Sequence, residues 1–368
     1  MLVLLLAALA LAFANGANDN FKATATLYGS RNLDYEGSRR LATAAQVAGS
    51  LASVLLAGAL LRAFGGKGLV PDAVVGDPIF LTAVGAGAAA TVLLATRVGL
   101  PISTTHALVG GLAGAGSALA PGQLSWEALG GSYFLPLLVS PLLALACAGV
   151  LYPLAHRARR ALGIEAEMCL CIGRSRDLVR QTADGAWIVE RTGMAVSVDQ
   201  IENCRTAYSG EALGVSIQSI VDGLHRVSAF SLGFARGLND TPKVLALLVT
   251  AGWAGLDPRL SLLIIAGTMA TGGFLRARRV AETLAHGITS LSHGQGLLAN
   301  AISSGLVIGA SLLGSPVSTT HVSTGALFGI GVWNDETDWS TAGSIVMAWV
   351  GTLPVAAILA AGVAWGLG

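Results

Sequence analysis

Charged residues are scarce in this chain. Asp, Glu, Lys and Arg together make up 12% of its 368 residues, whereas hydrophobic residues make up 53%. An average soluble domain has about 25% charged residues, so this composition excludes an ordinary soluble protein. The formal net charge is only +1, and the absence of a basic stripe argues against nucleic acid as a partner. Only four cysteines are present, too few for a disulfide framework in a chain of this length.

Glycine, by contrast, is abundant. The chain contains 48 glycines, and its mean hydropathy is +0.68. Small residues let membrane helices approach one another closely and permit broken helices where polar backbone lines a cavity. We therefore predict an all-α polytopic protein that crosses the lipid bilayer of the cell (inner) membrane several times.

Two short polar elements occur twice, in the same order. The first copy has GANDNFK at 16–22 and PISTTH at 101–106, and the second has GLNDTPK at 237–243 and PVSTTH at 316–321. The carboxylate and the serine are 84 positions apart in the first copy and 78 in the second. Ionisable residues within apolar stretches are costly in a membrane and are functional candidates by default. The duplication therefore predicts two half-sites that meet in one polar pocket inside the membrane.

A polar stretch divides the chain. Residues 155–208 carry Asp, Glu and Arg throughout and include short strand-like runs, whereas the flanking regions are mostly apolar. The cluster HRARR at 156–160 marks this stretch as cytoplasmic by the positive-inside rule. We predict a first membrane repeat over 1–154, a small cytoplasmic α+β insertion over 155–208 and a second membrane repeat over 209–368.

The basic loops indicate that the two repeats have opposite orientations. In the first repeat, the loop after the carboxylate element has three Arg and the loop after next has two basic residues; in the second repeat the counts are one and three. Cytoplasmic loops are rich in Lys and Arg, so this reversal predicts two inverted-topology repeats. In such repeats we expect discontinuous helices and re-entrant Ser-Thr-Thr elements near the membrane midplane.

Each Ser-Thr-Thr element has the composition of a helix N-terminus that can hold an anion. A proline near the helix start, capping hydroxyls and free backbone N–H groups together form an anion cradle. We expect two such cradles to surround an inorganic tetrahedral oxyanion. Their hydroxyl groups belong to Ser103, Thr104, Thr105, Ser318, Thr319 and Thr320.

The two aspartates must do something other than attract a negative substrate. Asp19 and Asp240 can accept a hydrogen bond from a substrate that still carries a proton, or hold a coupling cation. Phosphate keeps one or two protons near neutral pH, and sulfate keeps none. This difference favours phosphate, with a sulfate permease of the same fold as the alternative.

The four elements together resemble those of the inorganic phosphate transporter (PiT) family, as does RVAET at 279–283. The resemblance implies a symporter coupled to H⁺ or Na⁺, often a homodimer, in which Asp19, Asp240 and the Ser-Thr-Thr residues bind phosphate. It implies neither a cofactor nor a metal centre, and no enzymatic activity. Asn18 and Asn239 match family positions at or near the cation sites.

The chain departs from the family pattern at one place in each repeat. The pattern usually has a second Asn three residues after the Asp, associated with sodium, where this chain has Lys22 and Lys243. We hypothesise that each ammonium group stands in for a sodium ion, so that transport depends less on sodium and is proton-coupled. Alternatively, both lysines snorkel to the interface and only anchor the helix. Neutralised carboxylates would also tolerate fully ionised sulfate.

Other interpretations remain open at this point. His106 and His321 occur symmetrically, so they could relay protons, or they could satisfy buried hydrogen bonds and orient their neighbours. An anion channel is an alternative function because broken helices also line pores. A membrane protease with an aspartate dyad is another, but such a dyad requires neither duplicated Ser-Thr-Thr elements nor lysines beside both aspartates.

Overall fold

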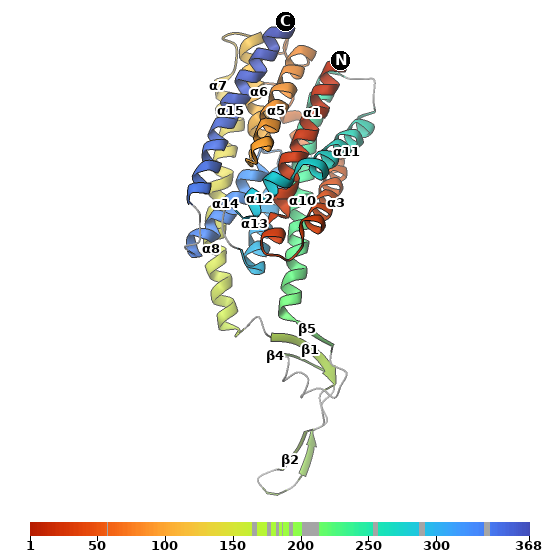
Figure 1. Ribbon diagram of the computed structural model, residues 1–368, viewed down its shortest axis with the longest axis vertical. Coiled ribbons are helices and arrows are strands. Elements are labelled where there is room, and N and C mark those ends of the chain that lie inside the picture. The colour runs from red at the N-terminus through yellow and green to blue at the C-terminus, as the bar shows by residue number, and fades with distance from the viewer. Residues whose placement is uncertain are drawn as a thin grey trace. The chain divides into compact units, whose positions relative to one another are not determined.

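The structure is a computed structural model that describes residues 1–56, 58–163, 168–174, 178–181, 184–185, 187–190, 194–200, 213–252, 257–286, 291–334 and 339–368. The chain divides into two compact units. One comprises Met1–Tyr152 with His225–Gly368, and the other comprises Pro153–Leu224. The first unit is helical, and Figure 1 shows the two chain termini at the same end of it.

The first half of the helical unit begins with a helix that changes its winding. Helix α1 (Leu2–Asp19) passes into a 3₁₀ turn, η1 (Asn20–Ala23), and then into the short helix α2 (Ala25–Gly29). The elements that follow are α3 (Tyr35–Leu56), α4 (Gly58–Ala63), α5 (Pro78–Val98), α6 (Thr104–Leu119), α7 (Trp126–Ala128), a π-helical segment (Leu129–Phe134) and α8 (Leu135–Ala161).

The second half of the chain contributes a similar series of helices. They are α10 (Ile217–Thr250), α11 (Pro258–Arg276), α12 (Arg278–His286), α13 (His293–Leu312), α14 (Thr319–Asn334) and α15 (Trp339–Leu367). Helices α11 and α12 meet at an angle of 70°. An abrupt bend of this size at Ala277 makes α12 run across its neighbours rather than along them (Figure 1).

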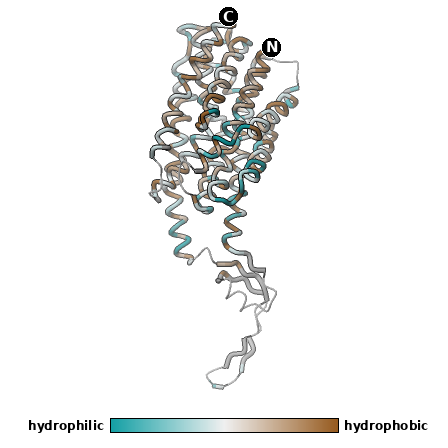
Figure 2. The backbone as a smooth tube through the Cα atoms, viewed as in Figure 1, coloured by the Kyte–Doolittle hydropathy of each residue, from teal (hydrophilic) through white to brown (hydrophobic). Residues whose placement is uncertain are grey.

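Several helices are long and apolar enough to cross a membrane, and Figure 2 shows hydrophobic residues along them. Among the described residues there are five such stretches, or six if the bent pair α11 and α12 counts as one span. The five are Leu2–Ala23, Pro78–Val98, Trp126–Ala161, His293–Leu312 and Ala342–Leu367. A span needs about 20 apolar residues, a length that all five reach or exceed.

Local sequence signals fix where the helices start and stop. The side chain of Asp77 accepts a hydrogen bond from the N–H of Ile79 (2.9 Å), and Pro78 occupies the first helical position of α5. Gly99 ends the same helix in the left-handed conformation, with φ of 79°. An Asp cap, a proline at the first position and a glycine after the last are the expected boundary residues.

The second carboxylate element lies within one continuous helix. Helix α10 continues from Ile217 to Thr250, although Pro242 lies inside it. A proline removes one backbone donor, which costs the helix the hydrogen bond to the carbonyl four residues earlier. The buried neighbours on both sides of Pro242 keep the helix in place despite this loss. In the first copy, α1 also runs through Asn15 and Gly16 and changes to 3₁₀ winding only at Asn20.

The second unit contains the described strands. They are β1 (Met168–Arg174), β2 (Leu178–Gln181), β3 (Trp187–Glu190), β4 (Met194–Gln200) and β5 (Leu213–Ser216). Strand β1 is central in an antiparallel sheet of order β4-β1-β5, and β2 pairs with β3. In this register Leu170 lies opposite Val198 on one side and Val215 on the other.

Helix α6, which follows the first Ser-Thr-Thr element, packs against the last helix of the chain. A Cβ atom added at Gly110 would lie 2.3 Å from the carbonyl oxygen of Leu353 on α15, and one at Gly114 would lie 2.0 Å from that of Ala357. Two glycines one turn apart therefore bring the two backbones into direct contact.

Helix α14, which follows the second Ser-Thr-Thr element, makes the equivalent contact with α8. A Cβ atom added at Gly325 would lie 2.4 Å from the carbonyl oxygen of Pro141, and one at Gly329 would lie 2.5 Å from that of Leu145. In both copies the glycines are the fourth and eighth residues after the histidine of the element. Each half of the chain thus packs its last helix against the Ser-Thr-Thr helix of the other half.

Candidate functional site

The two aspartates come from different halves of the chain and are bridged by one amide. The Nδ2 of Asn15 donates hydrogen bonds to Oδ2 of Asp19 (3.0 Å) and to Oδ2 of Asp240 (3.2 Å). The exposed fractions are 1% for Asp19 and 3% for Asp240. Helices α1 and α10 therefore place both carboxylates in one buried cluster.

Both lysines point into this cluster. Lys22 pairs with Asp19, and its Nζ donates to the carbonyl of Ile102 (2.6 Å) and the hydroxyl of Thr320 (2.5 Å). Only 5% of Lys22 and 1% of Lys243 is exposed. The interpretation that these lysines snorkel to an interface is therefore wrong, because their carboxylate and carbonyl partners lie inside the helical unit.

Lys243 makes the same set of contacts from the other half of the chain. Its Nζ lies 3.3 Å from Oδ1 of Asp240 and donates to the carbonyl of Val317 (2.9 Å) and the hydroxyl of Thr105 (2.7 Å). Each ammonium group thus binds the aspartate three residues before it, a carbonyl in its own half and a threonine in the opposite half.

The Ser-Thr-Thr elements begin helices, as the sequence indicates. Ser103 Oγ accepts a hydrogen bond from the N–H of His106 (3.1 Å) at the start of α6, and Ser318 Oγ accepts one from the N–H of His321 (3.2 Å) at the start of α14. These are N-cap contacts that satisfy one of the free donors of a helix start.

The threonines of these elements link the two halves. The hydroxyl of Thr105 donates to the carbonyl of Val317 (3.2 Å), and the hydroxyl of Thr320 donates to the carbonyl of Ile102 (2.9 Å). Thr104 donates instead to Oδ2 of Asp19 (2.9 Å), and Thr319 is also buried. The two elements therefore contact each other directly at the charged cluster.

The two asparagines that precede the aspartates hold the segments that precede the Ser-Thr-Thr helices. Asn18 accepts from the N–H of Ile102 (3.1 Å) and donates to the carbonyl of Leu100 (3.0 Å) and the hydroxyl of Thr96 (3.0 Å).

In the second half, Asn239 donates to Oδ1 of Asp240 (2.9 Å) and to the carbonyl of Val317 (3.3 Å), and it accepts from Ser311 (3.2 Å). Both asparagines are completely buried. Each one connects its carboxylate element to the Ser-Thr-Thr element of the same half.

The two symmetric histidines lie together. The ring centroids of His106 and His321 are 4.3 Å apart, and Trp349 stacks on His321 at 3.9 Å. These rings line one wall of a largely apolar cavity of about 590 Å³ between α8, α14 and α15. The ring Nδ1 of His106 also contacts Ser103 Oγ (3.0 Å). A role in proton relay remains a prediction for this pair.

Sequence reasoning missed one charged member of the site, Arg236. Its guanidinium donates to Oδ1 of Asn20 (3.0 Å) and Oδ1 of Asn15 (3.1 Å), and its Nε lies 3.8 Å from Oδ2 of Asp240. Arg236 is 1% exposed. Its signal was present in the sequence, because it is an arginine in an apolar run, one helical turn before an aspartate.

The cluster has an excess of positive charge. With all groups ionised, Lys22, Lys243 and Arg236 contribute +3 and the two aspartates contribute −2, which leaves a formal charge of +1. Charges that are buried in a weakly polarisable interior interact more strongly than charges in water. The cluster therefore attracts an anion and disfavours an additional cation.

Apolar helices arranged around a buried cluster of ionisable groups define a multi-pass helical membrane protein. The model of the family described as the phosphate transporter family matches residues 15–360. The chain therefore belongs to this family.

Similar proteins extend over most of the chain at lower identity. A probable low-affinity inorganic phosphate transporter of Mycobacterium bovis is 27% identical over 98% of this chain and 76% of that protein. A putative phosphate permease of Pyrococcus abyssi is 26% identical over 98% of this chain and 96% of that protein.

A putative phosphate permease of Mycobacterium bovis is 32% identical over 49% of this chain, and the match spans 34% of that permease, about a third of its length. Among solved structures, that of a sodium-dependent phosphate transporter matches with a TM-score of 0.74 at 18% identity, covering 100% of this chain and 98% of the other. This likeness shows a common fold.

Proposed function

We propose that this protein carries inorganic phosphate across the membrane and binds it at the buried cluster described above. One observation carries the proposal: three cationic side chains and two carboxylates lie between the starts of α6 and α14. Helix starts and basic side chains both favour an oxyanion. The names of the related permeases and transporters agree with phosphate as the substrate class.

In this proposal the hydroxyls and carboxylates change partners when the substrate enters. The hydroxyls of Thr105 and Thr320 accept hydrogen bonds from Lys243 and Lys22. An entering oxyanion offers both ammonium groups a stronger acceptor than a hydroxyl. It therefore separates the two elements and is held by Ser103, Thr104, Ser318 and Thr319 at the two helix starts, while Asp19 and Asp240 accept hydrogen bonds from the protons that the substrate keeps.

We further propose that transport proceeds by alternating access between two inverted repeats. The reciprocal contacts support this mechanism: each lysine binds a threonine of the opposite half, and each Ser-Thr-Thr helix packs on the last helix of the opposite half. Breaking such symmetric contacts on one side while forming them on the other is the usual route of rocking transporters. The direct contact between the elements favours a carrier over an open channel.

We propose proton coupling rather than sodium coupling, with Lys22 and Lys243 in place of sodium ions. Each ammonium group lies against an aspartate and a backbone carbonyl, which are oxygen ligands of the kind that a cation needs. A lysine that leaves its carboxylate in a buried site gives up a proton readily. The protein is proposed to act as a homodimer in the inner membrane, with residues 155–208 in the cytoplasm.

Sulfate is the second candidate substrate. The formal charge of +1 at the cluster favours it, since a fully ionised dianion needs no carboxylate to accept a proton. Phosphate keeps the advantage because two carboxylates are present to accept its hydrogen bonds.

The test is uptake of radiolabelled phosphate and sulfate into liposomes that contain the purified full-length protein. Each anion is measured with and without sodium and with and without an inward proton gradient. Saturable phosphate uptake driven by protons without sodium is expected. Uptake that requires sodium would contradict the proposal that the two lysines take the place of sodium ions. A preference for sulfate would contradict phosphate as the substrate.

A further inference from the structure

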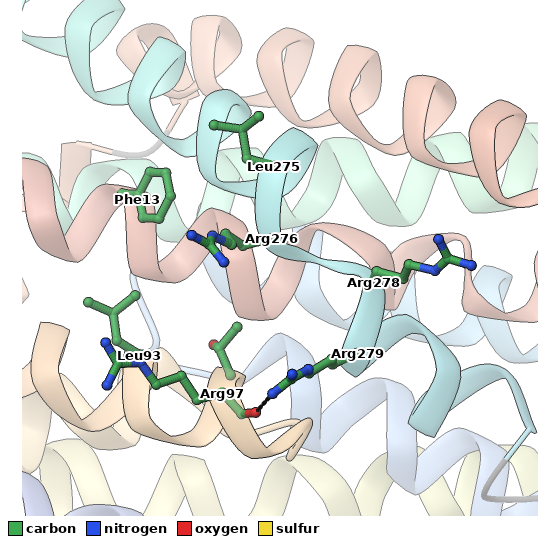
Figure 3. A pocket seen from close by; sticks show the side chains of 8 residues that line it. Phe13, Leu93, Arg97, Leu275, Arg276, Arg278 and Arg279 are labelled. Carbon is green, nitrogen blue, oxygen red and sulfur yellow. Dashed lines mark hydrogen bonds between the residues drawn. The ribbon is translucent and has the colours of Figure 1, made fainter.

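A second basic region lies outside the buried cluster, in a cleft between α1, α5, α11 and α12 (Figure 3). The cleft has a volume of about 520 Å³. Eight described residues line it, and four of them are arginines, with no carboxylate among the eight. These arginines are Arg97, Arg276, Arg278 and Arg279.

The four arginines differ in whether their side chains have bonding partners. Arg279 donates to the backbone carbonyl of Arg97, and Arg278 lies 3.9 Å from Glu282 and points away from the others (Figure 3). The guanidinium groups of Arg97 and Arg276 have no hydrogen-bond or ion-pair partner among the residues that the structure describes, and both residues are exposed. Figure 3 shows both guanidinium groups on the side of the cleft that holds Phe13 and Leu93.

This arrangement favours an anionic ligand. Guanidinium groups that share a cleft repel each other, and the apolar side chains around them provide no compensating charge. An oxyanion between Arg97 and Arg276 removes the repulsion and accepts paired N–H donors from each planar group. The chemistry that fits the cleft is therefore a phosphoryl oxyanion.

A series of hydrogen bonds also connects the cleft to the buried cluster. Thr96 lines the cleft and accepts a hydrogen bond from Asn18. Asn18 in turn accepts from the N–H of Ile102, whose carbonyl accepts from Lys22. Two residues, Asn18 and Ile102, thus link Thr96 in the basic cleft to Lys22 in the proposed substrate site.

We propose that the cleft is a second oxyanion site, in which Arg97 and Arg276 bind a phosphoryl group outside the buried cluster. When the anion is free phosphate, the site concentrates substrate next to the transport pathway, which raises the rate of association. The phosphoryl group of a lipid headgroup offers the same chemistry. The inference rests on the proposed function only for the transport role, since binding at the cleft does not require transport.

The first experiment measures binding without transport. The full-length protein in nanodiscs of neutral lipid is treated with phenylglyoxal, and the modification of each arginine is quantified by mass spectrometry. Phosphate is compared with chloride at equal ionic strength, and a parallel set of nanodiscs contains phosphatidic acid. Arg259, exposed at the opposite end of α11, is the internal control.

Phosphate is expected to slow the modification of Arg97 and Arg276 by about fivefold, because a bound anion protects both residues for most of the time. The modification rate of Arg259 is expected to stay unchanged. Protection by phosphate in neutral nanodiscs supports a site for the free anion. Protection only with phosphatidic acid supports the same site with a lipid headgroup as its ligand. Equal modification under all conditions would overturn the proposal.

A second experiment separates this site from the buried cluster. Arg97→Gln with Arg276→Gln is compared with Arg259→Gln in the uptake assay at low and high salt. The double variant is expected to raise the KM for phosphate by about fivefold at low salt, with less change at high salt and a maximal rate within about twofold. A fall in maximal rate without a change in KM would overturn the role in recruitment. If the unaltered protein shows no uptake, only the proposed function fails, and the protection experiment still decides the site.

Discussion

Lys22 and Thr320 lie 298 positions apart in the sequence, yet the ammonium group of one donates a hydrogen bond to the hydroxyl of the other. The same pair exists in reverse between Lys243 and Thr105. These two bonds link the halves of the chain at the charged cluster. They also identify the contacts that must change if the two elements separate during transport.

Removing one threonine hydroxyl should weaken this link. In Thr320→Val the ammonium group of Lys22 loses an acceptor and the carbonyl of Ile102 loses a donor. The loss of a buried hydrogen bond to a charged group costs about 1–3 kcal/mol, and the phosphate uptake rate is expected to fall about tenfold. Thr320→Ser, which retains the hydroxyl, should recover most of the rate. Equal rates for the Val and Ser variants would contradict the role of this bond.

The buried ion pair of Asp19 and Lys22 should behave as a unit. Lys22→Met alone leaves the Asp19 carboxylate without its cation, and removal of one partner of a buried pair costs about 3–5 kcal/mol. The double variant Asp19→Asn with Lys22→Met should regain part of this stability. The measurement is the thermal unfolding midpoint in detergent of the unaltered protein, of Asp19→Asn alone, of Lys22→Met alone and of the double variant.

An exposed arginine provides the comparison for this cycle. Arg40, whose side chain is 74% exposed in its ion pair, can be changed to Gln. Arg40→Gln should leave the unfolding midpoint unchanged, because exposed ion pairs contribute little. If the Asp19 and Lys22 effects add without coupling, the two side chains do not act together.

Restoring the amide at both lysine positions should change the coupling ion. The family pattern usually has Asn where this chain has Lys22 and Lys243. In Lys22→Asn with Lys243→Asn, Asp19 and Asp240 lose their ammonium partners and can accept a sodium ion instead. Phosphate uptake by this variant should require sodium, whereas Lys67→Asn in an exposed loop should behave as the unaltered protein does. If phosphate uptake by this variant does not respond to sodium, the proposal that the lysine ammonium groups stand in for sodium ions is contradicted.

Arginine at position 236 should not be replaceable by lysine. One planar guanidinium bonds both Asn15 and Asn20 and also lies beside Asp240. An ammonium group keeps the charge but cannot reach these partners with the same fork of donors. We expect Arg236→Lys to lower phosphate uptake by at least about tenfold, which corresponds to about 1.4 kcal/mol. Uptake close to that of the unaltered protein would show that only the charge matters.

The close contact of α6 with α15 should not tolerate a side chain. In Gly114→Ala the new Cβ atom would lie 2.0 Å from the carbonyl oxygen of Ala357, so the two helices must separate. Overpacking of this kind costs about 1–3 kcal/mol, and the unfolding midpoint is expected to fall. Gly305→Ala on α13 is the matched control, because its Cβ atom meets nothing within 4 Å and alanine favours a helix. Equal midpoints for the two variants would contradict the contact.

Part of the site could be recognised from the sequence because its signals are local or duplicated. The proline, serine and threonines at 101–105 predict a helix start, and α6 does begin at Thr104 with Ser103 as its cap. The ionisable residues Asp19 and Asp240 stood out because their surroundings are apolar. Arg236 had the same signal and was overlooked because it lies outside the duplicated elements.

The course of α10 through Asp240 shows that local helix propensity does not decide the structure there. Asparagine, aspartate and proline, which occupy 239, 240 and 242, are poor helix formers. In the structure α10 passes through these positions, and the residues around them are buried. Tertiary packing therefore overrides local propensity at this point, as it often does in buried helices.

The sequence by itself determined that the protein is a helical membrane protein with a duplicated polar site, because hydropathy, helix caps and repeats are properties of neighbouring residues. Only the tertiary structure decided which partners these residues have. It directed Lys22 and Lys243 inward to threonines of the opposite half, joined Asp19 to Asp240 through Asn15 and added Arg236 to the cluster. The physical reason is that these contacts depend on how distant helices pack, above all on the glycines that let α6 approach α15 and α14 approach α8.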